Sequence, residues 1–155
     1  MSEDTTSHTG EVGGSLRGVL MEDHARLERS LRALLDAGEG ALPNELIAVW
    51  NEFETGLRTH FQTEEESLFP LVTDEALRAS LMDDHAMLRE RLDELGVAIE
   101  LHSARLERIT ELVNLLRAHA AREDTTLYGL ADERASGGVR REVLRRLDRL
   151  RRELR

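Results

Sequence analysis

A chain of 155 residues is long enough for one domain with a buried core, and the absence of cysteine excludes disulfides, thiolate metal sites and thiol catalysis. The formal net charge of −10 argues against general binding to nucleic acids. Because there is no apolar run long enough for an integral membrane span, and the polar N-terminus lacks the apolar segment of a secretory signal, we expect a cytoplasmic protein.

The first half of the chain predicts a tail and a helical hairpin. Residues 1–14 are polar and acidic and predict a disordered N-terminal tail. Ser15 suits the N-cap of a first helix that ends near Gly38. Pro43 suits the first turn of a second helix, which Pro70 ends or kinks. Apolar residues recur every three or four positions in both segments, as in amphipathic helices.

The second half predicts another hairpin and a short final helix. Thr73, followed by two acidic residues, signals the start of a third helix, and its apolar seam continues to Ile99. We expect an exposed turn at His102 and a fourth helix capped by Ser103 that continues to Leu130. A pair of glycines at 137–138 then breaks the chain.

These elements predict an all-α fold, an up-down-up-down four-helix bundle over residues 15–136 with a short fifth helix over residues 137–155. Residues 139–155 contain eight arginines against three acidic residues, so the rest of the chain carries a net charge near −15. We expect this basic amphipathic helix to cap the acidic bundle or to form a homodimer. A protein partner, another acidic surface or a membrane face is an alternative contact.

The motif with the most chemical content is a histidine followed four residues later by a glutamate. It occurs at His60–Glu64 and again at His119–Glu123. In a helix the two side chains lie about 40° apart, on one face. The helix before each motif has one more histidine on its apolar seam, His24 in the first hairpin and His85 in the second.

The two hairpins are an internal repeat. Residues 21–27 match residues 82–88 at an offset of 61, and the His-x-x-x-Glu segments match at an offset of 59. The repeat predicts a pseudo-two-fold bundle. Counting residues from each histidine to the nearest turn, at 1.5 Å per residue, places all four histidines in one layer.

Four histidines and two carboxylates in one layer predict a two-metal site. A single histidine on an apolar seam is usually a satisfied core residue, but burying this whole set unpaired would cost several kcal/mol per charge. Imidazole with carboxylate suits iron or manganese, with zinc as an alternative. The order differs from the Glu-x-x-His of ferritin-like di-iron bundles and from the His-Glu-x-x-His of zinc proteases.

At these residues the chain resembles the hemerythrin-like family of histidine–histidine–glutamate (HHE) cation-binding domains, over about residues 16–133. The resemblance implies a non-haem di-iron centre with a bridging oxo or hydroxo group. It also implies that Glu64 and Glu123 bridge the two ions. The terminal ligands would be His24, His60, His85 and His119.

The chain departs from the oxygen-carrying hemerythrins in two places. They have a fifth histidine four positions after the third-helix histidine, where this chain has Arg89. Their last carboxylate lies five positions after its histidine, which corresponds to Asp124. We prefer Glu123 because it mirrors Glu64. The arginine argues against simple reversible oxygen carriage and leaves coordination positions for O₂, peroxide or NO.

Other polar residues near the motifs are interpreted as structural. Glu65 and Glu66 suit a solvated helix edge. Tyr128 lies nine positions after His119, about 180° away on an ideal helix, so it is not expected to be a ligand unless the helix distorts.

The sequence supports three hypotheses for function. The first is a di-iron protein that handles O₂, peroxide or NO, with catalase-like peroxide decomposition as the reaction to test and with no catalytic residue beyond the metal ligands. The second is an O₂, redox or iron sensor, or an iron store, that does not turn over. The third is a metal-free helical adaptor, in which replacing His60 or His119 by leucine is neutral or stabilising.

Overall fold

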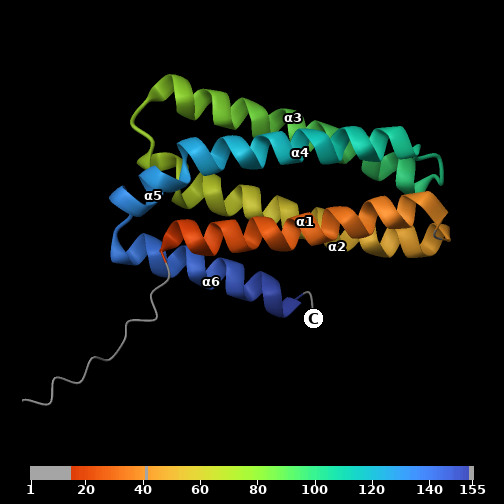
Figure 1. The fold of residues 1–155 in the computed structure, drawn as a ribbon, viewed down its shortest axis with the longest axis horizontal. Coiled ribbons are helices and arrows are strands. Elements are labelled where there is room, and N and C mark those ends of the chain that lie inside the picture. Colours follow the sequence, from red (N-terminus) through yellow and green to blue (C-terminus); the bar gives the residue numbers. More distant parts are fainter. Residues whose placement is uncertain (1–14, 41, 154–155) are drawn as a thin grey trace, which may run out of the picture.

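The computed structural model describes residues 15–40 and 42–153, so the tail predicted over residues 1–14 lies outside the described residues. Within these ranges the chain is almost entirely helical and contains no strand. The four long helices are α1 (Leu16–Gly40), α2 (Pro43–Ser67), α3 (Glu75–Glu100) and α4 (Leu106–Thr126). Each packs against the next, and α4 closes the ring against α1 (Figure 1). The predicted all-α bundle is confirmed.

The helix ends follow local sequence signals. The hydroxyl of Ser15 accepts a hydrogen bond from the backbone N–H of Gly18, and Pro43 occupies the first turn of α2. The N-cap of α3 is Asp74, one residue after the predicted start, and its carboxylate accepts two backbone N–H bonds. The fourth helix begins at Leu106 with Arg105 as its N-cap, two residues after the predicted N-cap Ser103. His102 is exposed in the turn, with a positive φ of 55°.

The fourth helix does not run on to Leu130 as predicted. It ends at Thr126, and a separate helix, α5 (Tyr128–Arg134), follows after Leu127. The first hairpin breaks at the equivalent place, where α2 gives way to the 3₁₀ turn η1 (Phe69–Leu71). Pro70 in η1 and Gly129 in α5 occupy equivalent positions, and both are poor helix residues.

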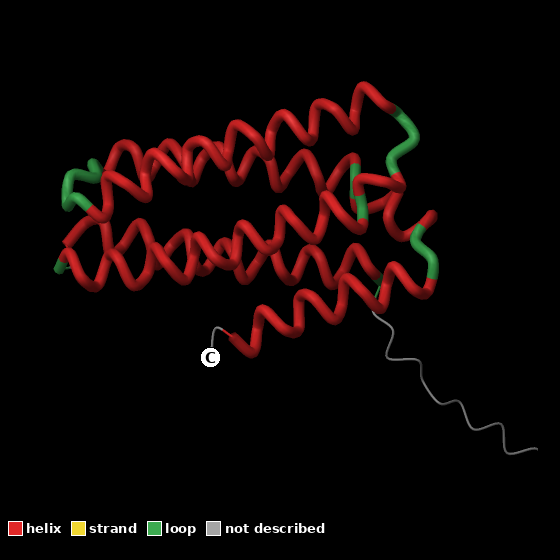
Figure 2. Tube along the Cα trace, turned by 180° about the vertical axis from the view of Figure 1, so that it is seen from behind, coloured by secondary structure: helices red, strands yellow, loops and turns green. Residues whose placement is uncertain are grey.

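The last helix, α6 (Gly137–Glu153), lies along the outside of the bundle against α2 and α1 (Figure 2). Val143 and Leu147 on its inner face are buried, and Arg146 forms an ion pair of 2.6 Å with Glu66 of α2. This packing agrees with a cap on the acidic bundle. In the part of the chain that the structure describes, no helix combines the length and apolar character needed to cross a bilayer.

A polar layer divides the apolar core into two clusters. One cluster surrounds Trp50 near the α1–α2 and α3–α4 turns, and the other lies near α5 and α6 and includes Phe69. Along α1 the change from one cluster to the other falls between Leu20 and Leu27, on either side of His24. The other three histidines occupy the same level in their helices, so the bundle presents all four to a common space.

Candidate metal centre

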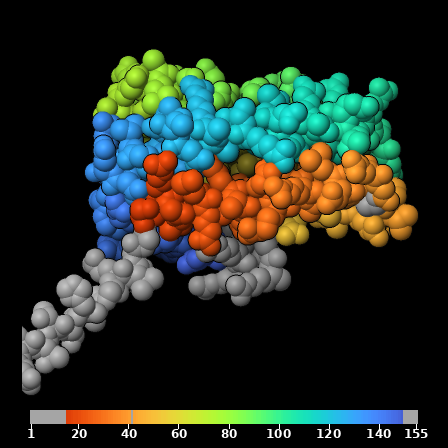
Figure 3. Space-filling model, in the orientation of Figure 1, coloured from red at the N-terminus to blue at the C-terminus, as the bar shows by residue number. Residues whose placement is uncertain are grey.

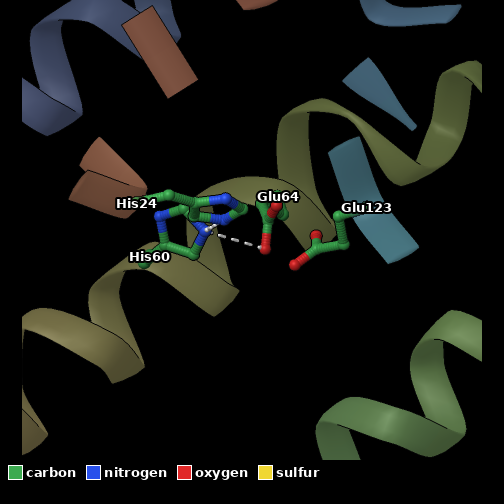
Figure 4. A group of neighbouring side chains, drawn as sticks. All are labelled: His24, His60, Glu64 and Glu123. Carbon is green, nitrogen blue, oxygen red and sulfur yellow. Dashed lines mark hydrogen bonds and ion pairs between the residues drawn. The ribbon is translucent and has the colours of Figure 1, made fainter. Parts of the chain in front are cut away.

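The six residues predicted from the repeat lie together in the middle of the bundle. Their ligand atoms form two groups, and within each group all atoms lie within 4.8 Å of one another. The His24 group contains His24 and His60, and the His85 group contains His85 and His119. Both groups contain Glu64 and Glu123. Figure 4 shows the His24 group, with the histidines and the two carboxylates facing the same space.

The histidines meet in pairs through their Nε2 atoms. His24 and His60 approach to 3.1 Å between these nitrogens, and His85 and His119 to 3.0 Å. Glu64 lies between the pairs, because its Oε1 is 3.2 Å from the Nε2 of His60 and 3.5 Å from that of His85. One carboxylate oxygen is therefore near a nitrogen of each group, as expected of a residue shared by two ions.

Each histidine turns its other ring nitrogen toward an outer carboxylate. The Nδ1 of His60 is 2.7 Å from Asp23, and in the second half the Nδ1 of His119 is 3.1 Å from Asp84. Both aspartates come directly before a seam histidine, so they are equivalent in the repeat. Arginines hold them in turn, since Arg26 pairs with Asp23 at 2.8 Å and Arg122 pairs with Asp84 at 2.7 Å.

The remaining two histidines face the residues that follow the shared glutamates. The Nδ1 of His85 is 2.7 Å from Glu65, and Arg89 donates two hydrogen bonds of 2.7 and 2.8 Å to the same carboxylate. The prediction that Glu65 is a solvated edge residue is therefore wrong. In the other half the Nδ1 of His24 is 3.5 Å from Asp124 and makes no hydrogen bond.

For His60, His85 and His119 this pattern determines which side of the neutral ring is available to a metal. A neutral imidazole carries one N–H, and a carboxylate beside Nδ1 selects the tautomer with the proton there. In this tautomer the Nε2 atom carries no proton, and its lone pair faces the centre. Two lone pairs 3 Å apart repel each other unless a proton or a cation lies between them. Metal-ligating histidines in proteins are usually oriented by such outer partners.

The two shared carboxylates, Glu64 and Glu123, have fewer hydrogen-bond donors than buried carboxylates need. Both are fully buried, and no described residue donates a hydrogen bond to the Oε1 atom of Glu64 or to either oxygen of Glu123. This holds although the Oε1 of Glu123 is only 2.7 Å from the Nε2 of His119. Buried oxygens without donors are costly, and a divalent cation compensates them. The residues therefore fit a metal pair.

Without a metal, the pKa values of the clustered residues shift in opposite directions. Burial and the nearby charge of Glu64 raise the pKa of Glu123 well above its usual range. Burial alone would raise the pKa of Glu64 too, but His60 holds that pKa well below its usual range. For His60, burial favours the neutral ring, but Glu64 and Asp23 raise its pKa to about 10. Burial and His60 together lower the pKa of His24 to about 4.

A family model for the hemerythrin HHE cation-binding domain matches residues 16–131, three quarters of the chain and all six clustered residues. The chain belongs to this family. Comparison with curated proteins and with solved structures gives no significant match. Arg89, which occupies the position of the additional histidine of oxygen-carrying hemerythrins, holds Glu65 and lies 5.6 Å from the centre of the Phe61 ring.

Tyr128 is a further polar residue of this hemerythrin-family centre. Its hydroxyl donates a hydrogen bond of 2.9 Å to Glu64 and lies 2.6 Å from the Nε2 of His24. The expectation that it points away assumed one continuous helix, and the break at Leu127 brings it inward. Burial and the charge of Glu64 raise its pKa well above the usual range.

The two adjacent acids in α4 differ in where their carboxylates lie. Glu123 belongs to both groups of ligand atoms, whereas Asp124 belongs to neither and faces the Nδ1 side of His24. Each of these outer partners lies next to a predicted ligand in both copies of the repeat, so the repeat contains a signal for them. In each half, one outer partner is the aspartate directly before the seam histidine, and the other is the acid directly after the shared glutamate.

A pocket of about 330 Å³ lies between α1 and α4 and reaches the metal centre. Figure 3 shows the hollow on this face, with deeper atoms in the colour of α2 at its bottom. Its walls are mostly apolar, with Leu27, Leu57 and Phe61 among them, and it reaches three of the four histidines. Glu28 and Arg117, which also line it, form an ion pair of 2.5 Å that links the two helices.

Proposed function

We propose that the chain is a non-haem di-iron protein that binds a small oxidant, O₂, peroxide or NO, with peroxide decomposition as the reaction to test. His24 and His60 would hold one ion, His85 and His119 the other, and both carboxylates would be shared. When bound, an iron pair supplies two redox-active Lewis acids. The convergence of four Nε2 atoms on two unsatisfied carboxylates is the observation that supports the proposal.

The chain's own residues would perform three tasks. The outer carboxylates Asp23, Asp84 and Glu65 keep the protons of three histidines on Nδ1, so that three Nε2 lone pairs stay directed inward. The two apolar clusters exclude bulk water above and below the layer, which strengthens electrostatic interactions within it.

The third task is selection of the ligand. The pocket between α1 and α4 has apolar walls, and an ion pair between Glu28 and Arg117 links its two sides. Apolar walls favour small neutral molecules such as O₂, NO and hydrogen peroxide over hydrated anions, which would lose hydration on entry. The pocket therefore favours a neutral oxidant over a hydrated anion.

The choice of iron over other metals rests on ligand chemistry. A set of imidazoles and carboxylates without thiolates suits iron or manganese and accepts zinc. Loading the apoprotein anaerobically with each metal in turn, followed by measurement of metal per chain, tests this choice. We expect iron to reach about two ions per chain, the stoichiometry of a two-metal site.

The activity is tested on the iron-loaded protein. Steady O₂ evolution from hydrogen peroxide is expected in the wild type and is expected to be lost in Glu64→Ala and Glu123→Ala, because both remove a shared ligand. Glu66→Ala is the matched control, since Glu66 lies on the same helix, is half exposed and pairs with Arg146 and Gln62, which lie outside the centre. It should retain both iron and turnover.

Two other results would change the proposal in different ways. An iron-loaded wild type without peroxide turnover would remove the catalytic claim and leave the sensor or store. A wild type that takes up no metal, together with unchanged or increased stability in His60→Leu, would support the metal-free adaptor. Deleting residues 137–155 is a poor test of a sensor output, because Val143 and Leu147 belong to the core.

A further inference from the structure

Tyr128 lies among the ligand atoms of the His24 group. Its hydroxyl oxygen is 2.6 Å from the Nε2 of His24, 3.4 Å from the Nε2 of His60 and 2.9 Å from the Oε2 of Glu64. The side chain is fully buried. The phenol oxygen therefore faces the same nitrogens and the same carboxylate that converge on the candidate metal position.

The repeat provides an internal comparison for this residue. Phe69 lies 59 positions earlier, at the same offset that relates the two His-x-x-x-Glu motifs. Leu68 and Leu127 end their helices in the same way, each donating a backbone hydrogen bond to the carbonyl of the shared glutamate. The ring of Phe69 is 5.0 Å from that of His85, and the ring of Tyr128 is 5.1 Å from that of His24. The two positions are therefore equivalent.

The difference between these positions is one hydroxyl group. A phenylalanine ring is sufficient to pack against the seam histidine, as Phe69 does in the second half. The hydroxyl of Tyr128 is thus not needed to fill the core. The hydroxyl places a buried oxygen where the equivalent residue, Phe69, has none. This oxygen lies next to three of the predicted ligand atoms.

We propose that Tyr128 is a seventh protein ligand of the metal pair, binding as a phenolate to the ion held by His24 and His60. The proposal rests on the di-metal site proposed above. Two donor atoms that bind one ion at about 2.1 Å and at right angles lie about 3 Å apart. The distances from the phenol oxygen to the two Nε2 atoms lie on either side of this value.

The competing interpretation is a phenol that only donates a hydrogen bond to Glu64. A hydroxyl has one proton, which is donated to Glu64 here, whereas the Nε2 atoms of His24 and His60 also lie within 3.4 Å of this oxygen. A cation satisfies all of them together. On binding, the O–H bond breaks, the proton leaves to solvent and the oxygen binds the metal, as a bound cation favours an anionic ligand.

Phenolate binding would make the two ions unequal. The ion in the His24 group would have two nitrogens, the shared carboxylates and a phenolate oxygen. The ion in the His85 group would have the same set without the phenolate, because Phe69 offers no donor atom. The second position would then have the smaller set of protein ligands, and His119 at the pocket belongs to it.

The sequence makes the test unusually specific. The chain contains one tyrosine and no cysteine, so a phenolate-to-ferric charge-transfer band can come only from Tyr128. The wild type and Tyr128→Phe are loaded with iron and oxidised, and iron per chain, visible absorption and resonance Raman spectra are recorded. We expect equal iron content, with phenolate ring modes in the wild type and their complete loss in the variant.

The outcomes separate this proposal from the proposed function. An iron-loaded wild type without phenolate modes would overturn the Tyr128 assignment and leave the di-iron site in place. A wild type that binds no iron would overturn both. Phe69→Tyr is a second variant that does not depend on the folding of the first. It places a phenol at the equivalent position of the His85 group and should intensify the phenolate modes.

Discussion

The two halves of the candidate metal centre contain the same predicted ligands but hold them differently. In the His85 half the seam histidine is fully buried, and its Nδ1 is 2.7 Å from Glu65, which Arg89 holds with two hydrogen bonds. In the His24 half the seam histidine lines the pocket, and its Nδ1 is 3.5 Å from Asp124. The seam histidine of the His85 half is therefore enclosed and firmly supported, whereas that of the His24 half is open to the pocket and loosely supported.

A single methylene group accounts for much of this difference. Glu65 and Asp124 occupy equivalent positions after the shared glutamates, and the aspartate is one methylene shorter. The longer side chain reaches its histidine, whereas the shorter one stops outside hydrogen-bonding range. The repeat thus duplicates the ligands, while small changes beside them separate a firmly oriented position from a more adaptable one.

The largest expected effect is the loss of a seam histidine. We expect both His24→Ala and His85→Ala to weaken binding of one metal ion by more than the roughly 10- to 100-fold that loss of an outer partner costs. His85→Ala should be the more severe, because it removes the better oriented ligand and leaves Glu65 without its histidine. Competition with a coloured chelator measures both affinities. Equal losses in the two variants would contradict the comparison.

The next effect concerns the outer carboxylates. Glu65→Gln should weaken metal binding by about 10- to 100-fold, because the uncharged amide holds the Nδ1 proton of His85 less strongly. Asp124→Asn should cost much less, since no hydrogen bond to His24 is lost. The same chelator titration compares them. A larger loss in Asp124→Asn would mean that the charge of Asp124, and not a hydrogen bond, supports His24.

The sequence was sufficient for the parts of this centre that follow from helix periodicity. The seams predicted the four-helix bundle, and the repeat predicted six residues that the structure brings together. Glu65 was missed because a helical wheel places it 100° from Glu64, and its role depends on His85 and Arg89 from a neighbouring helix. Such contacts between helices cannot be read from one helix alone.

Tyr128 was missed for a different reason. Its position depends on the end of α4 at Thr126, and the next residue, Leu127, is a good helix former and does not signal a break. Comparison of Gly129 with Pro70 in the repeat contains the signal, because both halves break where the second residue after the leucine is a poor helix former. The inference needs the alignment of the halves as well as local propensity.

A smaller effect is expected at Arg89. Its two hydrogen bonds hold Glu65, which in turn orients His85, so Arg89→Ala should weaken metal binding less than Glu65→Gln does. Arg91→Ala is the matched control on the same helix, because Arg91 is partly exposed and forms its ion pair with Glu94, outside the centre. The two variants should unfold at similar temperatures. An unchanged metal affinity in Arg89→Ala would show that Glu65 keeps its orientation without the arginine.

The smallest expected effect is a gain. Asp124→Glu adds the methylene that separates Asp124 from Glu65, so its carboxylate should reach the Nδ1 of His24 and make the hydrogen bond that is now absent. We expect metal binding to tighten by a few-fold, since the added bond orients a ligand that already faces the centre. The chelator titration compares the metal affinity of this variant with that of the wild type. Asp124→Asn, which should weaken metal binding slightly, is the comparison in the opposite direction. If the gain occurs while ligand exchange at the pocket slows, the short aspartate would be the feature that keeps the His24 half adaptable. Weaker binding would instead mean that the longer carboxylate competes with Glu123 or Tyr128 for the space around His24.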